Sequence, residues 1–169
     1  FDLLERYREK FSDKQDALAG KDNGQWKTYS TEDYIRLANT ISYGLLAMGL
    51  KKGDRVATIS NNRPEWNLVD MALSQAGMVH IPVYPTISID EYSYILTHSE
   101  PKLVIVSDKV LYGKVSPIVE KNSHIKGLYT YNEVEGTSNW KEILQKGEKG
   151  KDKYEKQLRE IRDSIDENE

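Results

Sequence analysis

Apolar runs recur along this chain at an almost constant interval. They occupy residues 55–60, 78–83, 102–107 and 127–132, so their first residues lie 23, 24 and 25 positions apart. That interval accommodates one strand, one helix and two short loops, and uninterrupted apolar runs are typical of parallel strands covered on both faces. The pattern therefore predicts an α/β fold, built as a layered, mostly parallel sheet with flanking helices.

The polar segments between the runs contain signals for helix ends. Ser30 and Asp33 have the spacing of a capping box, and Pro64 suits a first helical turn, where its missing N–H costs nothing. Gly49 and Gly77 stand where a left-handed residue can end a helix. We therefore predict one helix that begins beside Ser30 and stops at Gly49, and a second from Pro64 to Gly77.

Two further helices are predicted on either side of the third apolar run. Ser88 and Glu91 repeat the capping-box spacing, so a helix is expected to begin at Ser88. Another is expected over residues 110–121. Pro117 should interrupt this helix or start it afresh, because proline lacks the N–H that a helix interior requires.

The first thirty residues predict a separate motif. A helix is expected over residues 3–11, followed by a hairpin with strands DALAG at 16–20 and QWKTYS at 25–30. The turn lies at Asp22-Asn23-Gly24, and Asn-Gly is a strong hairpin signal because both residues tolerate positive φ. The fold is thus expected to carry a short N-terminal hairpin.

The composition changes towards the end of the chain. Of the residues at 146–169, 15 are charged, and an amphipathic helix is predicted from Tyr154 onwards, with one apolar face formed by Tyr154, Leu158, Ile161 and Ile165. We therefore divide the chain into an α/β unit, residues 1–145, and a charged amphipathic helix or linker, residues 146–169. The helix is expected to rest on its own domain or to be partly disordered. A coiled-coil or partner-binding role is the alternative.

Charge and residue usage exclude several classes of function. The 169 residues carry a formal net charge of -3, which disfavours nucleic acid as a partner, since phosphate neutralisation needs clustered basic side chains. No cysteine is present, so disulfides and thiolate metal sites are excluded and a cytoplasmic location is expected. No apolar run approaches the roughly 20 residues of a transmembrane helix. Because the first residue is not Met, we expect a piece of a longer protein.

Motifs of established chemistry are missing from the sequence. No glycine-rich phosphate loop follows a predicted strand, and the GEKGK segment at 147–151 is expected to be a flexible surface loop. His80, His98 and His124 lack the spacing of metal ligands, and His80 is expected to be a partly buried structural residue. We therefore assign no catalytic, cofactor-binding or metal-ligating residue.

Two polar loops follow predicted strands, at the edge where parallel α/β sheets commonly bind ligands. Asn62 belongs to the first loop and Tyr84 and Thr86 to the second, and these three residues are our candidates for lining a crevice. A purely structural interpretation is also open. In that interpretation Asn62 caps the following helix, Trp66 packs, and Pro85 shapes the chain.

The same loops carry a resemblance to a known family. NNRPEW at 61–66 and IPVYPTIS at 81–88 lie within two longer blocks, 28–66 and 76–107. These blocks resemble the early part of adenylate-forming enzymes and look most like long-chain fatty-acid CoA ligases. The resemblance implies the N-terminal subdomain of the acyl-CoA synthetase/luciferase-like fold.

The resemblance also implies a two-step reaction, in which ATP and Mg²⁺ activate a fatty acid and coenzyme A then captures the acyl group. The lysine-containing phosphate loop and the later motifs of the family are absent here. The chain by itself is therefore expected to be inactive and to bind none of these cofactors tightly. Its expected partners are the fatty acid and the remainder of the parent protein, with peripheral membrane contact as an option.

Three alternatives remain open at this level. The chain can belong to another adenylate-forming ligase, or it can be a stand-alone small-molecule-binding α/β module whose site lies near Asn62 and Tyr84. It can also be an interaction module that uses the charged C-terminal helix. Thermal stabilisation by a ligand would favour the binding module, whereas dimerisation lost without residues 154–169 would favour the interaction module.

Overall fold

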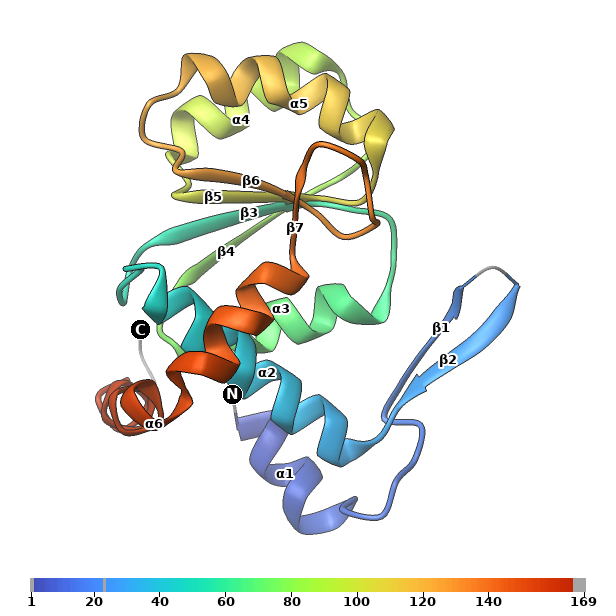
Figure 1. Ribbon diagram of the computed structural model, residues 1–169, viewed down its shortest axis with the longest axis vertical. Coiled ribbons are helices and arrows are strands. Elements are labelled where there is room, and N and C mark those ends of the chain that lie inside the picture. Colours follow the sequence, from blue (N-terminus) through green and yellow to red (C-terminus); the bar gives the residue numbers. More distant parts are fainter. Residues whose placement is uncertain (1, 23, 166–169) are drawn as a thin grey trace.

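A computed structural model describes residues 2–22 and 24–165, so the predicted turn residue Asn23 and residues 166–169 of the predicted C-terminal helix lie outside the described part. Its centre is a five-stranded sheet whose neighbouring strands are all parallel, in the order β4-β3-β5-β6-β7 (Figure 1). The strands are β3 Arg55–Ile59, β4 Val79–Val83, β5 Leu103–Val106, β6 Gly127–Thr130 and β7 Ser138–Asn139. The four predicted strands are confirmed. Sequence analysis missed β7 because two residues make no apolar run.

Helices cover both faces of the sheet, as uninterrupted apolar strands require (Figure 1). Their bounds are α2 Thr31–Ala47, α3 Pro64–Gln75, α4 Ile89–Ser99, α5 Lys109–Lys121 and α6 Lys141–Asp163. The first face packs against α2, α3 and α6, and the second against α4 and α5. The expected α/β layering is therefore present.

Two apolar cores lie on opposite sides of the sheet. Val56 and Ile105 belong to the core under α2, α3 and α6, whereas Ala57 and Val104 belong to the core under α4 and α5. All four side chains are fully buried. Adjacent residues of one strand are thus buried on opposite faces, which explains why the strand sequences are apolar throughout and do not alternate.

The two predicted capping boxes and the predicted left-handed glycine after α2 are present. Ser30 with Asp33 and Ser88 with Glu91 each form a complete capping box, at the starts of α2 and α4. Gly49 has a φ of 88° just beyond the end of α2. These features depend on hydrogen bonds between residues a few positions apart, so the sequence alone was enough to predict them.

The predicted break at Pro117 is wrong. The helix α5 continues through Pro117, and its N-cap residue is Asp108, whose side chain accepts two backbone hydrogen bonds. Proline removes one hydrogen bond from the helix, but Val115 and Ile118 are buried on the same helix and hold it against the sheet. Tertiary packing therefore keeps the helix continuous.

The predicted N-terminal helix and hairpin are present, but the first strand of the hairpin lies two residues later than the predicted 16–20. The helix α1 spans Asp2–Lys10, and the antiparallel hairpin consists of β1 Leu18–Asp22 and β2 Gln25–Tyr29. The hairpin extends away from the sheet (Figure 1). Near its base, a Cβ at Gly20 would lie 2.6 Å from the ring of Pro64, so the glycine permits close contact with the start of α3.

The helix α6 crosses α2 at close range through two glycines. A Cβ at Gly44 of α2 would overlap the Ile143 carbonyl oxygen, and a Cβ at Gly147 of α6 would overlap the Thr40 carbonyl oxygen. The missing side chains let the two backbones approach each other. α6 can then bury Ile143 and Leu158 in the first core.

Two predictions for this part of the chain are wrong. The helix begins at Lys141 and not at Tyr154, and the GEKGK segment at 147–151 lies inside the helix and not in a surface loop. Glycine costs about 1 kcal/mol in a helix interior, but close packing against α2 offsets that cost. The expected boundary between residues 145 and 146 falls inside α6. The composition becomes more charged at this point, but the helix continues without a break.

We expect Gly147→Ala to lower the free energy of unfolding by about 1–3 kcal/mol, because its methyl group would overlap backbone atoms of α2. Gly113→Ala is the matched control, since Gly113 lies in α5 and a Cβ there meets no atom within 4 Å. This control should raise the free energy of unfolding by about 0.5–1 kcal/mol. Urea denaturation followed by circular dichroism measures both, and stabilisation by both changes would contradict the close crossing.

Candidate functional site

The strand order produces a change of direction in the middle of the sheet. From β3 the chain passes through α3 to β4 on one side, whereas from β5 it passes through α5 to β6 on the other. Because α3 and α5 cover opposite faces, the loops that leave these adjacent strands diverge at the strands' carboxyl ends (Figure 1). Ligands of open α/β sheets bind at such a topological switch point.

A polar crevice of about 270 Å³ lies at this point. Residues that follow β3, β5 and β6 line it together with hairpin residues, and they include Asn61, Arg63, Ser107, Asp108, Asn132, Lys21 and Lys27. We call it the switch-point crevice. Its walls thus come from segments that are distant in sequence and are brought together by the strand order and the docked hairpin.

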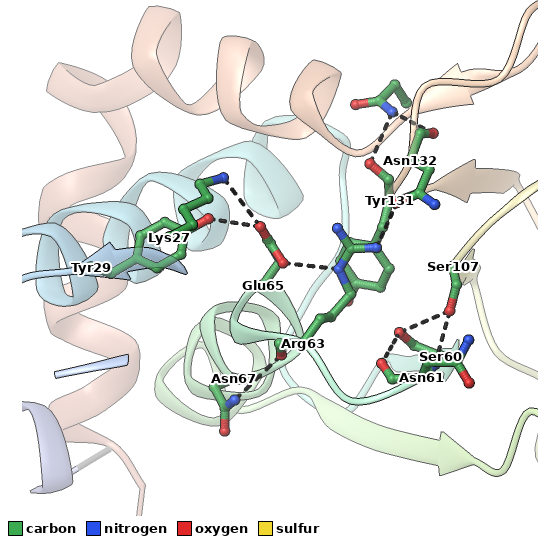
Figure 2. Close-up of polar contacts among 11 residues, drawn as sticks. Lys27, Tyr29, Ser60, Asn61, Arg63, Glu65, Asn67, Ser107, Tyr131 and Asn132 are labelled. Atoms are coloured by element: carbon green, nitrogen blue, oxygen red, sulfur yellow. Dashed lines mark hydrogen bonds and ion pairs between the residues drawn. The ribbon is translucent and has the colours of Figure 1, made fainter. Parts of the chain in front are cut away.

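Glu65, in the first turn of α3, joins the hairpin to this crevice (Figure 2). Its Oε1 accepts a hydrogen bond from Tyr29 Oη at 2.7 Å and lies 3.3 Å from Lys27 Nζ. Its Oε2 accepts from Arg63 Nε at 2.9 Å. Burial alone would raise the pKa of this carboxyl, but the hydrogen bonds from Tyr29 and Arg63 outweigh burial and lower the pKa to about 2.

Arg63 connects the same carboxylate to the loop that follows β6 (Figure 2). Besides its bond to Glu65, it donates from Nη1 to Asn132 Oδ1 at 2.9 Å, and its guanidinium lies 4.7 Å from the centre of the Tyr131 ring. Arg63 is also the N-cap residue of α3, without a side-chain capping bond. The expected cap at Asn62 is therefore wrong, because the helix begins one residue later than that role requires.

Two side-chain hydrogen bonds connect the loop after β3 to the end of β5, and a third lies within that loop (Figure 2). Ser107 Oγ accepts from the backbone N–H of Asn61 at 2.9 Å and donates to Ser60 Oγ at 3.1 Å. Ser60 Oγ donates in turn to the Asn61 carbonyl oxygen at 2.7 Å. Both hydroxyl groups therefore hold the two loops together, an arrangement that gives neither serine a basic partner for nucleophilic chemistry.

A second hollow, which we call the side hollow, lies next to the switch-point crevice and has a volume of about 520 Å³. The three candidate crevice residues, Asn62, Tyr84 and Thr86, all line it. Tyr84 is 80% exposed, so its ring stands in solvent beside the hollow. Asn61 and Asn62 line both cavities, so the polar crevice and the more apolar side hollow adjoin each other at the carboxyl edge of the sheet.

A chain of hydrogen bonds supports Trp66, which also lines the side hollow. Its indole N–H donates to Thr58 Oγ1 at 3.0 Å, and that hydroxyl lies 2.7 Å from His80 Nε2. The other ring nitrogen, His80 Nδ1, lies 2.7 Å from Asp70 Oδ1, so both nitrogens of the imidazole have a hydrogen-bond partner. His80 is thus the partly buried structural residue that we predicted.

Comparison with known proteins places this fold in a family. The family model described as AMP-binding enzyme matches residues 4–165. The chain belongs to this family. The structure of the long-chain-fatty-acid-CoA ligase FadD1 from Archaeoglobus fulgidus superposes with a TM-score of 0.73 and 21% identity, over 86% of this chain and 29% of that one. The predicted fold class is therefore confirmed.

Sequence relatives within the AMP-binding family carry ligase names. Fatty acyl-CoA synthetase A of Dictyostelium discoideum is 35% identical over 95 residues, which are 56% of this chain and 14% of that protein. The long-chain fatty-acid CoA ligase ACSBG2 of Gallus gallus is 28% identical over 154 residues, 88% of this chain and 20% of that protein. The resemblance noted from the sequence is confirmed, and the chain spans a fifth or less of these relatives' length.

The long-range hydrogen bonds of the switch-point crevice were not predicted from the sequence. Lys27, Tyr29 and Asn132 showed no pattern that linked them to Glu65 or Arg63, because the links span 36 to 69 positions. Only the strand order and the position of the hairpin bring them together.

Among the helices in the described part of the chain, none has the length and apolar content needed to cross a bilayer.

We expect Glu65→Gln to lower the free energy of unfolding at pH 7 by about 3 kcal/mol, because the variant loses a buried carboxylate with a lowered pKa. A lowered pKa stabilises the fold above the unfolded pKa, and this contribution disappears as pH falls towards 2. The difference between wild type and variant should therefore shrink between pH 5 and pH 2. Chemical denaturation across that range measures it, with the exposed Glu120→Gln as control. A difference that is constant with pH would contradict this assignment.

Proposed function

We propose that this chain is the N-terminal part of a long-chain fatty-acid CoA ligase. The observation that carries the proposal is the AMP-binding family match over residues 4–165, together with relatives that bear this name. In the proposed reaction a fatty carboxylate attacks the α-phosphate of MgATP and pyrophosphate leaves. The thiol of coenzyme A then attacks the acyl carbon and displaces AMP.

The chain's own residues do not fit the groups that this reaction needs. Charge that accumulates at phosphorus must be offset by backbone amides, a lysine and a divalent metal. The sequence contains no glycine-rich phosphate loop, and residues 2–22 and 24–165 contain no cluster of three acidic or imidazole side chains suited to a metal. We therefore assign the binding of ATP, Mg²⁺ and coenzyme A to the longer protein, and no catalytic step to this chain.

The contribution that we propose for this chain is scaffold and one wall of the active-site region. The side hollow is our candidate for that wall, since it combines the aromatic ring of Tyr84 with the amide of Asn62 and the hydroxyl of Thr86. Small-molecule sites typically pair apolar surface with a few polar groups. Residues 1–145 would form the α/β subdomain, and the charged residues 146–169 a helix or linker towards the remainder of the protein.

We also propose a cytoplasmic protein that contacts membranes peripherally. Two features support this: the absence of cysteine and the chemistry of the proposed substrate, since long-chain fatty acids partition into bilayers. The remainder of the parent chain would then be the main partner of the unit described above.

The proposal predicts activity for the longer protein and none for these 169 residues. The coding sequence beyond Glu169 should encode a Ser/Thr/Gly-rich loop that ends in Pro-Lys-Gly. The longer protein should release pyrophosphate in the presence of ATP and a fatty acid and then form acyl-CoA. The 169 residues alone should do neither, in the same coupled assay. Fatty-acid-dependent pyrophosphate release by these residues alone, or a longer protein without acyl-CoA formation, would refute the proposal.

Within the longer protein, Tyr84→Ala should lower kcat/KM for acyl-CoA formation about three- to tenfold, as expected for loss of one aromatic contact worth about 0.5–1.5 kcal/mol. Tyr84 is 80% exposed, so the fold should be unaffected. Tyr94→Ala is the matched control, because Tyr94 is 68% exposed on α4 and does not line the side hollow. If the Tyr84 variant were as active as wild type, the proposal that the side hollow forms part of the active-site wall would be wrong.

A further inference from the structure

We propose that the switch-point crevice binds a phosphate-bearing anion. The inference goes beyond the proposed function, which assigns phosphate chemistry to the longer protein. It depends on the charge, the polar lining and the position of a crevice that these 169 residues form on their own.

The lining of the crevice has an excess of positive charge. It contains the three cations Lys21, Lys27 and Arg63 and the two carboxylates Glu65 and Asp108. Glu65 is buried and already surrounded by donors, so its charge is matched within the protein. Asp108 directs Oδ1 towards backbone N–H groups in the first turn of α5. Lys27 is itself one of the donors to Glu65, so the three cations exceed the two carboxylates by one positive charge, and the hairpin lysine that lies over the Trp26 ring, Lys21, supplies it.

The two hairpin lysines are placed to contact an anion without leaving their present partners. Lys27 Nζ lies 3.3 Å from Glu65 Oε1, and its side chain remains 51% exposed. Lys21 Nζ lies 5.4 Å from the centre of the Trp26 ring. An ammonium group has three donors, so one contact with the protein leaves donors for a ligand.

Side-chain amides supply donors from the sheet edge. Asn61 and Asn132 line the crevice at the ends of β3 and β6. Because Asn132 Oδ1 already accepts from Arg63, its NH₂ group is the part that can donate to a ligand. A phosphate group has acceptor oxygens that point in different directions. It can therefore accept from the lysines on one wall and the amides on the other.

The position of the crevice supports the same ligand class. It lies at the switch point between β3 and β5, and the N-termini of α3 and α5 both border it. The Asp108 carboxylate already accepts from the first-turn N–H groups of α5, so the helix dipole that favours a further anion is that of α3, whose N-cap residue makes no side-chain capping bond. A fatty-acyl chain, in contrast, would find few apolar partners among the charged and amide side chains that form these walls.

The test is an NMR titration of the ¹⁵N-labelled 169-residue chain with sodium pyrophosphate, at constant ionic strength. We expect saturable shifts at millimolar concentrations, confined to backbone amides at residues 20–21, 61–63, 65, 107–108 and 132. Affinity should fall as sodium chloride is added, because the lysines are exposed. An absence of saturable shifts at these residues would overturn the proposal.

Charge-removing variants test the assignment of the lysines. Lys27→Gln and Lys21→Gln should each weaken pyrophosphate binding about fivefold, since one unit charge at 4 Å in water is worth about 1 kcal/mol. Lys149→Gln removes the same charge from an exposed position on α6 and should leave the affinity unchanged. Equal affinity in all three variants would overturn the proposal, provided that their spectra show intact folds.

Two further probes identify the source of the phosphate. In one titration ATP replaces pyrophosphate, and in the other adenosine does. If ATP binds at least as tightly as pyrophosphate and adenosine causes no shifts, the ligand is a nucleotide held by its phosphates. Binding of pyrophosphate but not ATP would indicate an inorganic anion. Acyl-CoA formation by the longer protein together with no pyrophosphate binding here would refute this inference alone. The reverse result would refute only the proposed function.

Discussion

The central strands β3 and β5 are buried on both faces, and their right-handed crossovers run in opposite directions, to β4 and to β6, which puts the helices that follow them on opposite sides of the sheet. A strand with apolar side chains on both faces must be covered by helices on both faces. α3 therefore packs on one face and α5 on the other, and the loops that lead to them separate at the carboxyl edge. The switch-point crevice is a direct consequence of this arrangement.

The buried carboxylate of Glu65 connects that crevice to the hairpin. A two-stranded hairpin is marginally stable in isolation, so the contacts at its base decide whether it holds one position. Tyr29 and Lys27 approach Glu65 from the hairpin, and Arg63 approaches it from the start of α3. Removing any one donor would leave a buried charge with fewer partners, which is the costly situation for ion pairs of this kind.

The position of α6 at the end of the chain depends on how closely its backbone can approach that of α2. Two helices can cross with their backbones in contact only where side chains are missing, and Gly44 and Gly147 provide that space. Glycine usually weakens a helix, which is why the glycines near residue 147 predicted a loop. In α6 the apolar burial of Ile143 and Leu158 offsets that weakness. Intrinsic propensity and tertiary packing thus favour different structures, and packing decides.

The sequence by itself determined the strands β3 to β6, the capping boxes at Ser30 and Ser88, and the family. These features depend on neighbouring residues or on a repeated apolar interval, and both can be read along a single chain. Tertiary structure alone decided the continuity of α5 and α6 and the meeting of Glu65, Arg63 and Asn132. Those outcomes depend on which strands are adjacent and how closely helices approach, and the spacing of apolar runs does not encode strand order.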